Sequence, residues 1–165
     1  MTLQANLDLT ARWNDRRALD LSTPVDAGAI ALTDELLHGT AIDQADLLWH
    51  DRRTLAATSE NLDLAGGLTD AFGQTLTFAK IKALLIKNRE TIAGRTLKVG
   101  GHATAAFLLF DNATDIYTIG PDGILLVWDP ALAGKVVTAT TGDLLKIDAG
   151  ANTVAYDILL IGTSA

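Results

Sequence analysis

Cysteine is absent from this chain of 165 residues. The chain therefore has neither disulfides nor zinc–thiolate sites, and we expect packing, hydrogen bonds and assembly to hold its fold in any redox compartment. Long apolar runs are absent too. The run from Ala105 to Phe110 is among the longest, whereas a membrane-spanning helix needs about 20 residues. The sequence thus predicts no membrane partner.

Basic residues are also scarce. There are 13 Lys+Arg against 20 Asp+Glu, which gives a net charge of −7. Binding to a polyanion depends on clustered Lys and Arg, so we expect no nucleic-acid partner. Hydrophobic residues make up 48% of the chain, which argues against disorder. Met1 is followed by neither a basic start nor an apolar run, so no targeting segment is predicted.

Short segments bounded by turn residues are typical of β-strands rather than long helices. The clearest turn is Gly120-Pro121-Asp122-Gly123, and β-branched and aromatic residues flank it. We therefore predict a hairpin that joins strands 116–119 and 124–128. Further strands are predicted at 82–87, 96–99, 105–110, 135–140 and 144–147.

The C-terminal run 153–161 alternates strictly, with Val154, Tyr156, Ile158 and Leu160 on one face. A strand this apolar is expected to be central in its sheet. The segment 44–56 fits helix or strand, and the alternation from Asp46 onward favours a strand.

The predicted fold is all-β, an antiparallel β-sandwich of the jelly-roll kind with an extended N-terminal arm. Residues 1–34 are assigned to the arm or to first strands, and residues 35–165 to the sandwich domain. At least seven strand candidates without a convincing long helix support this assignment.

No arrangement of residues indicates catalysis or a metal site. His38, His50 and His102 are isolated, whereas a metal site in a β-barrel needs two His one residue apart and a carboxylate. No serine lies in a Gly-x-Ser-x-Gly frame. The oxygen-rich loop 111–115 offers calcium ligands, although a polar loop between strands needs such residues anyway. We predict no enzyme activity, no cofactor and no metal.

One internal similarity is notable. The segments 13–19 and 49–55 share a Trp, an Asp-Arg-Arg triplet and a Leu at the same positions. Arginine and tryptophan are enriched at protein interfaces, while the alternative is an exposed strand with cross-strand charge pairs. The candidate interface residues are Trp13, Arg16, Arg17, Trp49, Arg52 and Arg53.

Three blocks in the middle of the chain, 46–57, 61–73 and 76–84, resemble a family of small proteins encoded among bacteriophage and prophage structural genes. Later blocks agree, including Gly120–Gly123, 141–147 and 154–162. The resemblance implies a virion component made in the bacterial cytoplasm, namely a capsid decoration (cement) protein or a head or tail accessory protein. Its partner would be the major capsid protein or a tail protein, and the family supplies no catalytic residues.

Particles are symmetric, so a decoration protein is expected to form a closed homo-oligomer, with a trimer favoured over a dimer. A carbohydrate-binding module is the alternative, because β-sandwiches often hold sugar sites. Such a site needs exposed aromatic rings, and Trp13 and Trp49 are the only candidates. A jelly-roll enzyme is a third hypothesis, for which no cluster of titratable residues is visible.

Overall fold

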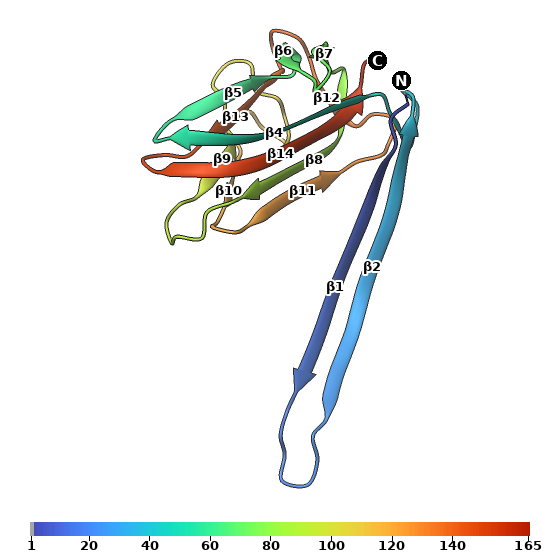
Figure 1. Cartoon of the computed structure of the whole chain (residues 1–165), viewed down its shortest axis with the longest axis vertical. Helices are drawn as coiled ribbons and strands as arrows, with labels where there is room; N and C mark the ends of the chain where they lie inside the picture. The colour runs from blue at the N-terminus through green and yellow to red at the C-terminus, as the bar shows by residue number, and fades with distance from the viewer. Residues whose placement is uncertain (1) are drawn as a thin grey trace.

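The structure is a computed structural model that describes residues 2–165. In this range the chain forms fourteen β-strands and no helix, so the all-β prediction is confirmed. None of residues 2–165 belongs to a helix that is long and apolar enough to cross a membrane. The strands form a body of several sheets and one long hairpin that projects from it (Figure 1).

The projecting hairpin consists of β1 (Ala5–Arg16) and β2 (Val25–His38). We call these two strands the ribbon. Their antiparallel register runs without a shift from Ala5 opposite Leu36 to Arg16 opposite Val25. β2 ends against the short parallel strand β3 (Gln44–Ala45). β2 continues past residue 34, so the predicted boundary between arm and domain falls inside a strand.

The larger sheet of the body has the order β11-β8-β14-β4, and a short β12 also pairs with β8. Its strands are β4 (Leu47–Ala56), β8 (Lys80–Asn88), β11 (Ile124–Trp128), β12 (Lys135–Val136) and β14 (Thr153–Thr163). β14 lies between β8 and β4, and its alternate residues from Val154 to Leu160 are buried. The predicted central position of this strand and its predicted apolar face are both confirmed.

The second sheet has the order β10-β9-β13-β5. Its strands are β5 (Ser59–Asp63), β9 (Leu97–Gly100), β10 (Ile116–Ile119) and β13 (Leu144–Asp148). A small hairpin of β6 (Ala65–Thr69) and β7 (Thr75–Thr77) follows β5. Leu84 and Tyr156 of the larger sheet share one hydrophobic cluster with Val99 and Leu145 of the second sheet, so the core lies between the two sheets.

Three local predictions are wrong in their pairing or extent. The Gly120–Gly123 turn forms as expected, but β10 and β11 do not pair with each other. β10 pairs with β9 and β11 with β8, so the turn carries the chain from one sheet to the other. The segment 105–110 makes only an isolated bridge, and the strand predicted at 135–140 is limited to β12. These three predictions fail because the local sequence pattern does not encode which distant strand a segment pairs with.

Candidate interaction surface

The ribbon has two chemically different faces. In an antiparallel pair, directly opposite residues project to the same side, and successive residues alternate between sides. One side holds three successive apolar pairs, which we call the apolar strip: Leu9 with Leu32, Ala11 with Ile30, and Trp13 with Gly28. The other side is polar on β1, with Asn6, Asp8, Thr10, Arg12, Asn14 and Arg16, and carries mainly small apolar residues on β2, with Val25, Ala27, Ala29, Ala31, Thr33 and Glu35.

The apolar strip is open to solvent. Leu9 is 44% exposed, Ile30 58% and Leu32 52%. The Trp13 indole lies across Gly28, where a Cβ atom would be 2.2 Å from Trp13 Cζ2. An isolated two-stranded hairpin is marginally stable in water, because one layer of two strands buries little apolar area. The apolar strip is therefore a surface that a second layer of structure covers in most β-sheets.

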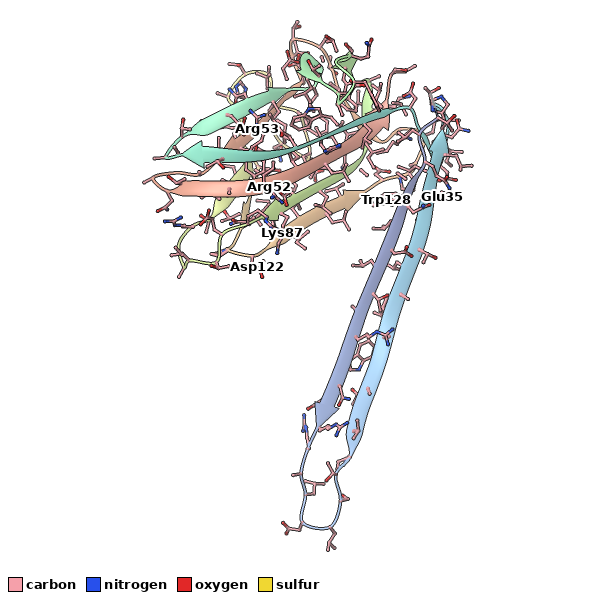
Figure 2. All side chains as sticks on the ribbon, viewed as in Figure 1. Glu35, Arg52, Arg53, Lys87, Asp122 and Trp128 are labelled. Carbon is pink, nitrogen blue, oxygen red and sulfur yellow. The ribbon has the colours of Figure 1, made fainter. Side chains whose placement is uncertain are left out.

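The root of the ribbon is fixed to the body by the same face. Beyond the pair of Leu7 and Asp34, the next residue of β2 on this face is Leu36, which is fully buried and clusters with Ala83 of β8 and Ile161 of β14. The indole nitrogen of Trp128 on β11 donates a hydrogen bond to Asp34 Oδ2 at 2.6 Å. Figure 2 shows Glu35 and Trp128 where the ribbon leaves the body. The ribbon thus runs across the strands of the larger sheet and continues beyond its edge strand β11 (Figure 1).

The outer face of the larger sheet consists of cross-strand rows. The pairings β11–β8, β8–β14 and β14–β4 place one residue of each strand in a row. We name three of them. The root row, beneath the ribbon, is Trp128, Ala83, Ile161 and Leu48. The leucine row is Leu126, Leu85, Leu159 and His50. The charged row is Ile124, Lys87, Asp157 and Arg52.

The leucine row lies next to the ribbon root and is incompletely covered. Leu126, Leu85 and Leu159 are all half-buried, although they lie on three adjacent strands. Only Leu159 among them packs against the cluster that anchors the ribbon. The body therefore presents a second, partly open apolar surface beside the place where the ribbon leaves it.

The charged row closes this surface on its far side. Arg52 donates two hydrogen bonds to Asp157, from Nε at 2.6 Å and from Nη2 at 3.2 Å. This contact lowers the pKa of Asp157 below its ordinary value. Lys87 pairs with Asp122 in the same way, as Figure 2 shows at the end of the sheet distant from the ribbon. Arg52, a predicted interface residue, is thus exposed and has an intramolecular partner.

The other predicted residues of β4 occupy different environments. Trp49 is 6% exposed and belongs to the core, so its indole is unavailable for surface contacts. Its assignment as a surface contact is therefore corrected: as an apolar residue on the inward side of β4, it is covered by the second sheet.

Arg53 is half-buried and donates from Nε to Glu60 Oε2 at 2.7 Å and from Nη1 to Asp51 Oδ2 at 2.9 Å. The Tyr156 hydroxyl donates to the other oxygen of Glu60. Burial, and secondarily this hydrogen bond, raises the pKa of Tyr156 well above its ordinary value. Because Glu60 belongs to β5, the network of Arg53, Glu60 and Tyr156 joins the two sheets and has a structural role.

The predicted residues of the first motif lie at the outer part of the ribbon. Trp13 is 45% exposed and ends the apolar strip. Arg16 lies on the polar side, where its Nε donates to Asn14 Oδ1 at 3.1 Å. Arg17 follows β1 and is 3.5 Å from Asp15. The sequence analysis missed Leu9, Ile30 and Leu32, because they become one surface only through the pairing of β1 with β2.

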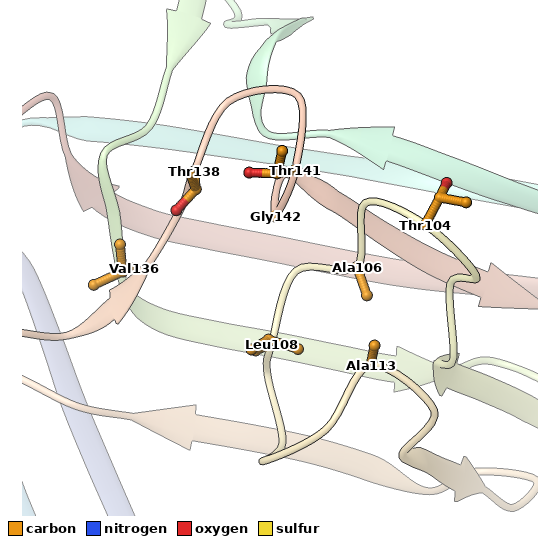
Figure 3. Close-up of a pocket in the computed structure, with 8 residues that line it drawn as sticks. All are labelled: Thr104, Ala106, Leu108, Ala113, Val136, Thr138, Thr141 and Gly142. Atoms are coloured by element: carbon orange, nitrogen blue, oxygen red, sulfur yellow. The ribbon is translucent and has the colours of Figure 1, made fainter.

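Within residues 2–165, no group of three or more His, Asp and Glu side chains is placed to hold a metal ion. The oxygen-rich loop is closed on itself, since the Asn112 amide donates to Asp115 Oδ2 at 2.9 Å. A surface pocket of about 430 Å³ lies between the loops 104–113 and 136–142 (Figure 3). Threonine, alanine, leucine, valine and glycine line it, so it offers no acid or base.

Comparison with protein-family models, curated proteins and solved structures found no match for this chain.

Proposed function

We propose that this chain is a non-enzymatic structural protein that assembles through its N-terminal ribbon. The observation that supports the proposal is the apolar strip, which stays open to solvent along a ribbon that projects beyond its own body. Exposed apolar surfaces rimmed by polar residues are characteristic of interaction sites. A ribbon that is covered only in an assembly gives the chain a means to join one subunit to a neighbouring protein.

The body is, in this proposal, a jelly-roll β-sandwich. Its eight main strands pair as nested antiparallel pairs: β4 with β14, β5 with β13, β8 with β11 and β9 with β10. Nested pairs of this kind arise when one long hairpin is rolled up, which is the topology of a jelly roll. Jelly rolls are frequent in viral capsid proteins and lectins.

The proposed setting is a virion, with the chain as a capsid decoration protein bound to the major capsid protein. The support is the resemblance to phage structural proteins, together with a body of several sheets that carries a projecting arm. The second candidate for a virion role is a head or tail accessory protein. Sugar binding has less support, because Trp49, one of the two tryptophans predicted to form the stacking platform, is buried.

To test the proposal, phage particles from the strain that carries the gene are purified by density-gradient centrifugation. Their protein composition is then measured. We expect mass spectrometry to find this chain at a fixed ratio to the major capsid protein. A strip variant, Ile30→Asp with Leu32→Asp, should be lost from the particles. The matched variant Ala29→Asp with Ala31→Asp adds the same charge to the opposite face and should be retained. Particles that lack the wild-type chain would refute the virion setting.

A further inference from the structure

We propose that Lys82 sets the direction of the ribbon, because its buried ammonium group holds the chain segment to which the root of the ribbon is fixed. The inference rests on the proposed function, since a ribbon that joins its body to a neighbouring protein needs a defined direction. We call residues 128–131, which begin with the last residue of β11, the clamp segment.

The clamp segment contacts the ribbon root at two points. The first is the hydrogen bond from the Trp128 indole to Asp34 of β2. At the second, the Pro130 carbonyl oxygen accepts a hydrogen bond at 3.0 Å from the amide of Asp43, in the turn that follows β2. The Asp43 carbonyl oxygen accepts in turn from the Leu37 amide at 2.9 Å. Asp43 therefore connects the clamp segment to the end of β2.

Lys82 of β8 holds the clamp segment with both its backbone and its side chain. Its carbonyl oxygen accepts a hydrogen bond from the Asp129 amide at 2.7 Å. Its Nζ atom donates to the Pro130 carbonyl oxygen at 3.4 Å and also to the Ala131 carbonyl oxygen. The Pro130 oxygen thus receives one hydrogen bond from the body and one from the ribbon root, so the two are joined at a single atom.

A β-bulge gives the Lys82 side chain its place. Ile161 of β14 lies opposite Ala83 of β8. The next residue of β14, Gly162, lies opposite Ile81, so Lys82 is one extra residue without a partner in β14. On the other side of β8, the pairing passes at the same point from β11 to β12. Bulges bend a strand and redirect a side chain, and they are common next to functional sites.

The packing of the body does not need a charge at this position. The Lys82 side chain is fully buried, and at Gly134 an added Cβ atom would lie 3.3 Å from Lys82 Cδ. Burial, and secondarily repulsion from Lys80, lowers the pKa of Lys82, while Asp129 and Asp43 act in the opposite direction. A buried ammonium group costs free energy that an apolar side chain of similar size avoids. What the charge adds is a fixed place for the clamp segment, and with it a fixed ribbon.

The experiment measures the direction of the ribbon in the full chain, in which cysteine is naturally absent. Nitroxide labels are attached to Leu21→Cys at the ribbon tip and to Ala151→Cys in the turn between β13 and β14, two exposed positions. Double electron–electron resonance then gives the distribution of distances between the two labels. This labelled chain is the parent for all variants.

The test variant adds Lys82→Met, which keeps an apolar stem and removes the ammonium group. The matched control adds Lys87→Met, which removes a second ammonium group of β8 that pairs with Asp122 and not with the clamp segment. Far-UV circular dichroism of each variant verifies that the body is folded.

We expect one narrow distribution for the parent and for Lys87→Met, and a several-fold broader distribution for Lys82→Met. A folded Lys82→Met chain with a narrow distribution would overturn the proposal, as would equal broadening in both variants. A broad distribution in the parent, found for a chain that is present in phage particles, would overturn the fixed direction and leave the proposed function intact.

Hydrogen exchange of the unsubstituted chain tests the clamp even if Lys82→Met fails to fold. The amides of Asp43 and Asp129 belong to one network, so we expect both to exchange slowly and at similar rates. Fast exchange at Asp43 together with slow exchange at Asp129 would show that the ribbon root opens while Lys82 stays in place. That result would overturn the proposal.

Discussion

The two Trp-x-Asp-Arg-Arg segments form strands with the same alternation but in opposite environments. In β4, Trp49 faces inward and the second sheet covers it, so that it is 6% exposed. In β1, Trp13 has the same place in the alternation, but no second layer lies over it, and it is 45% exposed. The motif therefore specifies a strand with one apolar side, and the surrounding structure decides whether that side is core or surface.

The arginines differ in the same way. Arg53 is held by Glu60 of a neighbouring strand and by Asp51, whereas the corresponding Arg17 is largely exposed and has only Asp15 nearby. In the body the motif completes a network between two sheets. In the ribbon the corresponding arginine contacts only a residue of its own segment, Asp15, and joins no second strand.

The largest expected contrast comes from removing the two tryptophans. Trp49→Ala should lower the free energy of unfolding by about 3–5 kcal/mol, because it leaves a cavity in the core. Trp13→Ala should change the stability of the body by no more than about 0.5 kcal/mol. Urea denaturation followed by circular dichroism at several protein concentrations measures both. If both variants lost the same free energy of unfolding, the contrast between a core Trp49 and a surface Trp13 would be wrong.

Two glycines sharpen the comparison. At Gly162 in β14, an added Cβ atom would lie 2.1 Å from the backbone oxygen of Lys80. Gly162→Ala should therefore destabilise the chain by about 1–3 kcal/mol, since a backbone cannot move aside easily. At Gly28 the obstacle is the Trp13 side chain, which can rotate into solvent. Gly28→Ala should leave the thermal midpoint nearly unchanged and should expose the indole, as a red shift of tryptophan emission would show.

The smallest expected effect is a loss of stability at acidic pH, which comes from a carboxyl group in the body. The Ala155 amide, and secondarily Arg95, lower the pKa of Glu90 below its ordinary value. A carboxyl whose pKa is lower in the folded state stabilises the fold above its unfolded pKa, and this contribution disappears as the pH falls through the folded pKa. Thermal midpoints should thus be level from pH 7 to about pH 5 and should fall below it. Glu90→Gln should flatten this fall, which thermal unfolding followed by circular dichroism across this pH range would measure.

Much of the body follows from local pattern. The alternation of residues 153–161 predicts both the strand and its buried face, because strand periodicity is a local property. The Gly120–Gly123 turn is likewise encoded locally. Its two strands belong to different sheets, however, because β10 pairs with β9 and β11 pairs with the more distant β8.

The candidate site could be predicted only in part. Trp13 was identified from its motif, but Leu9, Ile30 and Leu32 are isolated apolar residues until β1 pairs with β2. The leucine row is even less visible in the sequence, because Leu85, Leu126 and Leu159 come from three distant segments. A surface that consists of one residue per strand leaves no local signal in any of them.

The root of the ribbon also has a consequence for biosynthesis. β1 and β2 are synthesised before β14, which carries Ile161, one of the residues that cluster with Leu36. Leu36 therefore gains this contact only after β14 has joined its sheet. A chain without β14 would keep the root contacts with β8 and β11, such as Ala83 and the hydrogen bond from Trp128 to Asp34.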